Sequence, residues 1–212
     1  MKIAIIMPSR GLEFTEVEEY IEKERRLNPH DIQVYRSHNL PIPECLNVLV
    51  EQAFNDGAEM FYFIEDDTVP PDESLNKLLE SNHDIVAIDY GQMGGKSTIT
   101  RSSIDNRILF TGFGCTMIKR KVFEGMEKPW FRSDKALSLP SLTWGDVDPL
   151  TSYGLHDVNF GFKARELGFT IEQIEGECKH LKLIALNTTG TNNGCHDIGE
   201  KEKISKPQTL NV

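Results

Sequence analysis

The sequence contains no apolar run long enough to cross a membrane and no amino-terminal secretory signal. It passes directly from Met1 and Lys2 into a short apolar segment over residues 3–7. A membrane-spanning helix needs about 20 apolar residues, and a signal peptide also needs a longer apolar core than this. We therefore expect a cytoplasmic protein without a transmembrane segment, which for a viral chain means the host cytoplasm.

The sequence also lacks an excess of positive charge and any closely spaced pair of cysteines. Its formal net charge is −10, with 33 acidic side chains against 23 lysines and arginines. This balance argues against a nucleic-acid partner, because sequence-independent binding needs a basic face. The four cysteines are too sparse for a disulfide scaffold, and the apolar patterns around Cys45 and Cys115 predict buried core thiols.

Strand-like and helix-like segments alternate through the first half of the chain. A length of 212 residues with 39% hydrophobic residues suits one domain with a sizeable core. Helices are predicted from Thr15, where Glu18 completes a capping box, from near Pro43, and over 73–80. Strands are predicted over residues 2–7, 32–35, 60–64 and 84–89. This order predicts an α/β fold with a doubly wound, mostly parallel, Rossmann-like sheet.

The second half has weaker patterns. Residues 98–118 favour strands, 122–125 a short helix and 153–167 a longer helix, and two further strands are expected over 169–174 and 178–183. Residues 129–149 show no periodicity and are predicted to form an irregular region. Trp144, within this region, is either a platform for an acceptor sugar or a core residue.

Three adjacent acidic residues, Glu65, Asp66 and Asp67, directly follow the apolar run 60–64. That run is typical of a strand buried on both faces of a parallel sheet. The acids are therefore expected at the carboxyl end of the strand, where open α/β sheets bind ligands. Because packed carboxylates repel one another unless they share a cation, the cluster favours a divalent-metal site. A solvated acidic turn is the alternative.

Four segments, in order along the chain, carry a resemblance to a known family. They are FIEDDTVP at 63–70, TGFGCTMIKR at 111–120, HDVNFGFKARELG at 156–168 and Lys179-His180. With these segments the sequence resembles the GT-A type glycosyltransferases, in the style of the large inverting family two. The resemblance implies one such domain over 1–183, with a nucleotide-sugar-binding half (1–91), an acceptor-side half (92–183) and a polar tail over 184–212.

In such enzymes an acidic element at a strand end holds Mn²⁺ or Mg²⁺ against the diphosphate of a nucleotide-sugar. The resemblance implies Asp67 as the main metal ligand, with Glu65 in the position of the usual aspartate and His180 reaching back to the same ion. Carboxylate oxygens suit either cation, and an imidazole favours Mn²⁺. Asp66 is then expected to face the ribose or the sugar. A hydrogen-bonded surface histidine is the alternative for His180.

The resemblance also implies a catalytic base. Asp157 matches the acid that removes the acceptor proton in the inverting enzymes, although His156 replaces the glutamate that commonly precedes it. A base on a firm helix start can approach the acceptor hydroxyl. The alternative is a carboxylate favoured there only by the helix dipole.

Further positions are expected to contact the donor. Pro8 and Arg10 lie in the loop after the first strand, where the resemblance places the base and ribose, and Arg10 is otherwise a solvated loop residue. Gly112 and Gly114 would let the backbone approach the donor sugar, or else mark strand bulges. The implied nucleotide-sugar contacts are Pro8, Arg10, Glu65, Asp66, Gly112 and Gly114.

The sequence thus predicts a metal-dependent transfer of a sugar, with inversion, from a UDP- or GDP-sugar to an acceptor hydroxyl. The acceptor is a glycan, a protein or a small molecule, and a homodimer is an assembly that the sequence allows. One alternative is a nucleotidyltransferase that makes nucleotide-sugars, although the first loop has little of the Gly-rich, basic signature expected there. Another alternative is a non-catalytic relative that binds sugar or nucleotide. A glycoside hydrolase is less favoured, because adjacent acids suit a metal better than a spaced pair.

Overall fold

The structure is a computed structural model. It describes residues 1–9, 11, 13–38, 40–91, 97–138, 143–146 and 155–182, with the backbone alone for 135–138 and 143–146. All of these residues belong to one compact unit, Met1–Lys182. None of the described helices is long and apolar enough to cross a membrane.

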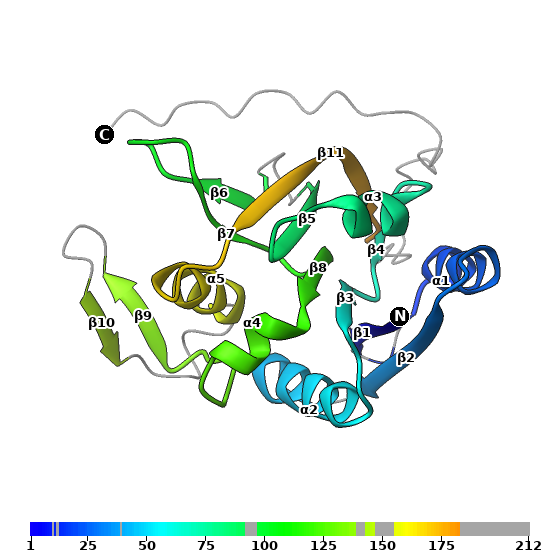
Figure 1. Cartoon of the computed structure of the whole chain (residues 1–212), viewed down its shortest axis with the longest axis horizontal. Coiled ribbons are helices and arrows are strands. Elements are labelled where there is room, and N and C mark those ends of the chain that lie inside the picture. Colours follow the sequence, from blue (N-terminus) through cyan, green and yellow to red (C-terminus); the bar gives the residue numbers. More distant parts are fainter. Residues whose placement is uncertain are drawn as a thin grey trace, which may run out of the picture. The chain divides into compact units, whose positions relative to one another are not determined.

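A mixed sheet of seven strands forms the centre of this unit, in the order β2-β1-β3-β8-β5-β11-β4 (Figure 1). Its strands are β1 (Lys2–Ser9), β2 (Asp31–His38), β3 (Met60–Ile64), β4 (Thr68–Val69), β5 (Ile85–Tyr90), β8 (Cys115–Lys119) and β11 (Ile171–His180). Strand β1 is parallel to β2 and β3, and β5 is parallel to β11. Strand β8 is antiparallel to both β3 and β5. The predicted α/β, Rossmann-like fold class is confirmed.

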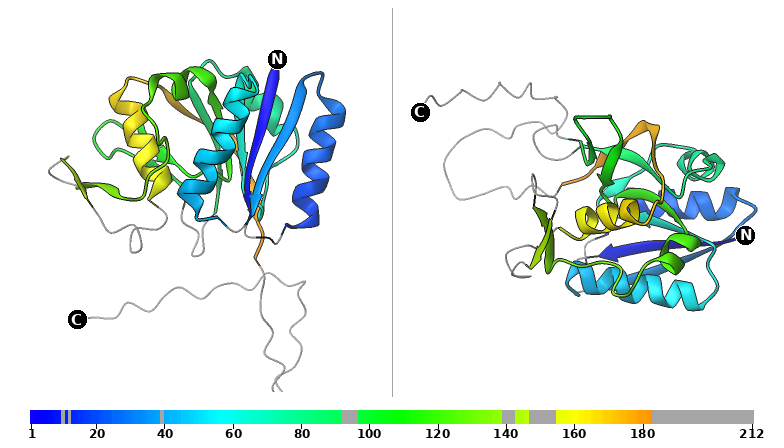
Figure 2. Two further views of the ribbon diagram at one scale, coloured as in Figure 1. Left: turned by 90° about the horizontal axis from the view of Figure 1, so that it is seen from below. Right: turned by 60° about the vertical axis from the view of Figure 1, so that its left-hand side comes forward.

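Helices cover both faces of the sheet, as Figure 2 shows for α1 on one side and α2 and α5 on the other. The helices are α1 (Thr15–Leu27), α2 (Ile42–Asn55), α3 (Ser74–Glu80), α4 (Arg120–Gly125) and α5 (His156–Glu166). Alternate residues of one strand supply the two cores, because successive side chains point to opposite faces. In β1, Ile3 and Ile5 pack with α1 and α3, whereas Ala4 and Ile6 pack with α2, α4 and α5.

An aromatic cluster fixes α5 against the sheet. The rings of Phe131 and Phe160 stack with centroids 5.0 Å apart, and Phe63 of β3 meets Phe131 edge-on at 5.8 Å. Stacked and edge-on rings stabilise a core beyond the area that they bury. The cluster therefore joins the first residues of α5 to the strand that precedes the acidic triplet. The two thiols predicted as core residues, Cys45 and Cys115, are buried.

The strand order and two segments differ from the sequence predictions. The strand expected over 84–89 is β5, but β8 separates it from β3. The two strands expected over 169–174 and 178–183 are a single strand, β11, whose register shifts between Ile174 and Glu177. Within 129–149, expected to be irregular, β9 (Lys135–Ser138) and β10 (Thr143–Asp146) pair antiparallel. The side chain of Trp144 falls outside the description.

The capping box predicted for α1 is wrong. The helix begins at Thr15, so the residue in the capping position is Phe14 and not Thr15. Phe14 makes no side-chain capping bond. The entry to α1 is instead held by the backbone N–H of Phe14, which donates to the carbonyl oxygen of Asp66 at 3.3 Å. The acidic turn therefore fixes where α1 begins.

We expect Gly161→Ala to destabilise the fold, because α5 packs directly on the hairpin of β6 (Ile99–Arg101) and β7 (Ile108–Thr111). A Cβ at Gly161 would lie 2.4 Å from Cβ and 2.7 Å from Cα of Phe110. The overlap should cost about 1–3 kcal/mol of unfolding free energy, more than the gain in helix propensity. Denaturant unfolding measures this loss. Lys163→Ala on the exposed face of α5 is the control, expected to change stability by at most about 0.5 kcal/mol.

Candidate functional site

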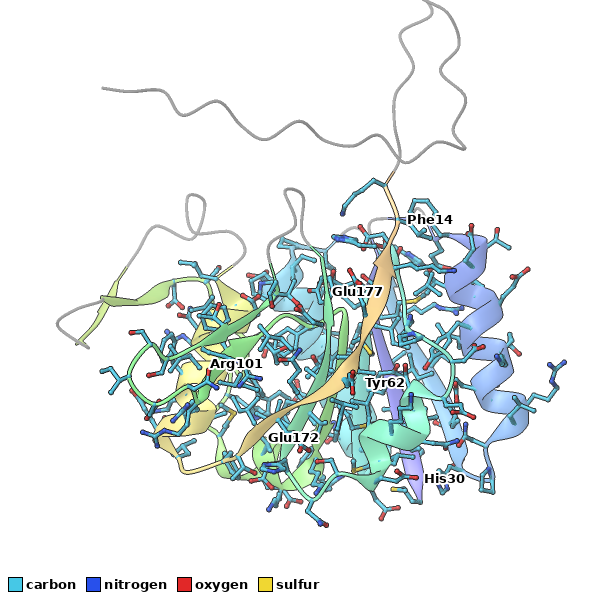
Figure 3. The ribbon with its side chains drawn as sticks, turned by 90° about the horizontal axis from the view of Figure 1, so that it is seen from above. Phe14, His30, Tyr62, Arg101, Glu172 and Glu177 are labelled. Carbon is cyan, nitrogen blue, oxygen red and sulfur yellow. The ribbon has the colours of Figure 1, made fainter. Side chains whose placement is uncertain are left out.

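The acidic triplet lies at the carboxyl end of β3, as predicted, and the end of β11 is joined to it. Strand β4 pairs antiparallel with β11, with Thr68 opposite His180. The N–H of Leu181 then donates to the carbonyl oxygen of Asp67 at 2.7 Å. In Figure 3, Phe14, which contacts the acidic turn, lies beside the end of β11, whereas Glu172 at the start of β11 lies toward the opposite end of the sheet. Residues far apart in the sequence therefore meet at one sheet edge.

Three side chains converge in this place: Glu65, Asp67 and His180. Each offers one potential ligand atom, and the three atoms lie within 4.8 Å of one another. Nε2 of His180 is 3.3 Å from Oδ2 of Asp67, and the Asp67 side chain is only 6% exposed. Two carboxylates and an imidazole are a donor set that suits a divalent cation. The residues predicted as metal ligands are thus brought together.

The tautomer of His180 follows from its partners. Nδ1 lies 2.8 Å from the carbonyl oxygen of Gly91, which can only accept, so Nδ1 carries the proton. Nε2 then presents its lone pair toward Asp67. A hydrogen bond from the other ring nitrogen to a backbone carbonyl is a usual way in which proteins orient a metal-ligating histidine.

An ammonium group contacts two of the three potential ligand atoms. Nζ of Lys182 is 3.0 Å from Oδ2 of Asp67 and also contacts Nε2 of His180. Because an ammonium only donates, the contact agrees with the lone pair on Nε2. The site therefore accommodates positive charge. Lys182 was not predicted from the sequence, because only the pairing of β11 with β4 brings it to the acids.

Tyr90, the last residue of β5, lies beside His180. Its ring meets that of His180 edge-on, with centroids 5.5 Å apart. Burial, followed by the negative charges of Glu65 and Asp157, raises the pKa of the Tyr90 hydroxyl well above its ordinary value. One phenol therefore senses both the acidic triplet and the predicted base. Apart from its place at a strand end, no sequence pattern points to this residue.

Tyr90 also explains the two glycines. A Cβ at Gly112 would lie 2.3 Å from the Tyr90 hydroxyl oxygen, and one at Gly114 would lie 2.6 Å from Cε1 of the ring. Real Cβ atoms do not approach other atoms so closely, so both positions need glycine for packing. Their predicted contact with the donor stays a prediction.

The other predicted donor contacts are placed unevenly. Pro8 is buried near the end of β1, and the register that pairs Ile6 with Phe63 puts Pro8 level with Glu65. Asp66 is 3% exposed, and its role toward a ribose or sugar stays a prediction. Arg10 lies outside the described residues.

Asp157 lies in the first turn of α5, and its Oδ1 accepts from the N–H of Val158 at 2.7 Å. Burial raises the pKa of this carboxyl to about 6. Burial also lowers the pKa of the adjacent His156 to about 4. Among the described residues, Nδ1 of His156 is buried without a hydrogen-bond partner. Both side chains are therefore poised to be neutral near pH 5, and only Asp157 becomes charged toward pH 7.

Comparison with known proteins supports the fold. No protein-family model matches the sequence, and no curated protein matches it. Among solved structures, the chain is similar to protein A197 from STIV, with a TM-score of 0.57 and 15% identity over 82% of each chain. It is also similar to the catalytic domain of Drosophila beta1,4-galactosyltransferase 7 in complex with xylobiose, with a TM-score of 0.54 and 18% identity over 86% of this chain and 71% of that one. At such identities the similarity supports a GT-A-like fold alone.

We expect Asp157→Asn to stabilise the protein at pH 7.5. The folded-state pKa of Asp157, about 6, lies above its ordinary 3.8, so the folded wild type loses stability as the pH rises from about 4 to 6. The variant lacks this loss and should be more stable at pH 7.5, by about 1–3 kcal/mol. Denaturant unfolding at several pH values measures the difference, which should vanish below about pH 4.

The neighbouring histidine supplies an internal control. The pKa of His156 is depressed from 6.5 to about 4, so its contribution has the opposite sign and stability increases between these pH values. Wild type should therefore show a shallow profile, and Asp157→Asn should show the rise due to His156 alone. If Asp157→Asn were less stable than wild type at pH 7.5, the carboxylate of Asp157 would not be destabilised by burial as described.

Proposed function

We propose that this protein is a metal-dependent glycosyltransferase that moves a sugar from a nucleoside-diphosphate-sugar to an acceptor hydroxyl, with inversion. The convergence of Glu65, Asp67 and His180 at the carboxyl end of β3 is the observation that carries the proposal. Open α/β sheets bind ligands at this edge. The GT-A-like fold is compatible with the proposal, and the galactosyltransferase among the similar structures supports a transferase without defining its substrates.

In this proposal Asp67, Glu65 and His180 hold Mn²⁺ or Mg²⁺. The residues fit such an ion, because Nε2 of His180 is fixed as a lone-pair donor and the site accommodates an ammonium beside the Asp67 carboxylate. A divalent cation held there would supply Lewis-acid stabilisation of the departing nucleoside diphosphate. The imidazole of His180 favours Mn²⁺ over Mg²⁺ in this set.

Asp157 is the proposed base. With a pKa of about 6, its carboxyl is ionised at neutral pH and still basic enough to take a proton. It removes the acceptor proton as the acceptor oxygen attacks the anomeric carbon and the bond to the diphosphate breaks. Attack on the face opposite the leaving group inverts the configuration. The raised pKa predicts an activity that falls as the pH drops through about 6.

The donor is proposed to lie between the two halves of the domain. Pro8, Glu65 and Asp66 come from the half 1–91, and Gly112 and Gly114 come from the half 92–183. The boundary of the domain at residue 183, the tail over 184–212, the contact of Arg10 with the donor and a homodimer all stay predictions.

We expect Asp67→Asn and Asp157→Asn to separate binding from transfer. Calorimetry with UDP or GDP, with and without Mn²⁺, should show metal-dependent binding in wild type, and Asp67→Asn should abolish it because the main carboxylate ligand is lost. Asp157→Asn should keep the binding and lower the rate of sugar transfer by about 10²- to 10⁴-fold, the usual loss of a general base.

Asp72→Asn is the matched control. Asp72 is an exposed acid soon after the triplet, and it pairs with Lys23, so its loss should change neither binding nor transfer. If the wild type bound no nucleotide in the presence of Mn²⁺, the proposal would be wrong. Release of pyrophosphate from a nucleoside triphosphate and a sugar phosphate would indicate a nucleotidyltransferase, and binding without turnover a non-catalytic relative.

A further inference from the structure

We infer that the ammonium of Lys182 competes with the divalent cation for the same ligand atoms, so that Lys182 has to leave before the cation binds. The inference rests on the proposed metal site and concerns its regulation. Lys182 is held in place by the same two residues, Asp67 and His180, that are proposed to ligate the ion.

The two cations compete for a single lone pair of His180. Nδ1 of His180 is committed to the carbonyl oxygen of Gly91, which leaves the ring one lone pair, on Nε2. An imidazole lone pair serves one partner at a time, either the ammonium or a metal. Because Nζ of Lys182 contacts Nε2, the two cations exclude each other at this atom.

The two cations also compete for the negative charge of Asp67. The side chain of Asp67 is 6% exposed, and its Oδ2 lies 3.0 Å from Nζ of Lys182 and 3.3 Å from Nε2 of His180. A buried carboxylate is strongly disfavoured without a counter-charge. Lys182 supplies a positive charge from within the chain, so an incoming divalent cation has to replace the ion pair between Lys182 and Asp67. This replacement lowers the apparent affinity of the site for the divalent cation.

Lys182 is also able to leave the site. Its side chain is 43% exposed, and a lysine carries its charge on a flexible four-carbon stem. The backbone stays fixed, because the N–H of Leu181 donates to the carbonyl oxygen of Asp67. Displacement therefore needs only rotation of the side chain and leaves the pairing of β11 with β4 intact.

Calorimetric titration of wild type and Lys182→Met with Mn²⁺, alone and with UDP present, tests the inference. We expect Lys182→Met to bind Mn²⁺ about three- to tenfold more tightly, the change expected when a partly exposed ion pair no longer competes. Lys179→Met is the matched control, since Lys179 is an exposed lysine of the same strand. The Lys179→Met variant should bind Mn²⁺ within about twofold of wild type, because solvent screens the charge of this exposed lysine.

A second measurement needs no altered protein in the binding step. In ¹⁵N-lysine-labelled wild type, the side-chain ammonium signal of Lys182, assigned by its loss in Lys182→Met, should move on addition of Mg²⁺ while that of Lys179 does not. An unmoved Lys182 signal at saturating Mg²⁺ would overturn the inference. So would equal or weaker Mn²⁺ binding by Lys182→Met. If neither wild type nor Lys182→Met binds Mn²⁺ in either condition, the proposed metal site itself is wrong.

Discussion

The short pairing of β4 with the end of β11 is the constraint on which the candidate site depends. Strand β4 is only two residues long, yet its pairing and the bond from Leu181 to Asp67 bring together residues that are 115 positions apart. Closing so long a loop costs conformational entropy, which the packed sheet already offsets through β5 and β11. The few backbone bonds at the edge therefore position His180 without having to stabilise the fold themselves.

Electrostatics follows from this arrangement. Acidic side chains gather at one sheet edge of a chain with a net charge of −10, and the ammonium of Lys182, 3.0 Å from Oδ2 of Asp67, offsets part of their repulsion. Asp157 and His156 carry opposite shifts from one cause, burial, since burial disfavours the charged form of each. The same desolvation therefore keeps both side chains neutral near pH 5.

Most strands and helices could be predicted from local sequence patterns, whereas the strand order and the long-range contacts of the site could not. Short apolar runs identified β1, β3 and β5, and the helical spacing of apolar residues identified the helices between them. The insertion of antiparallel β8 between β3 and β5 leaves no local mark, since a five-residue apolar strand reads alike in either direction. Likewise, Glu65, Asp67 and His180 were found by resemblance and brought together by the fold. Tyr90 and Lys182 acquire their places only through long-range contacts.

The packing of Tyr90 on Gly112 and Gly114 has a consequence for how this protein can change. Neither glycine can gain a side chain while the ring fills the adjoining space. Substitutions at these three positions are therefore expected in a fixed order. A smaller residue replaces Tyr90 first, and larger residues follow at Gly112 and Gly114. In the reverse order, the intermediate variants would have overlapping atoms. A change at Tyr90 therefore has to come before any change of the two glycines that reshapes the site.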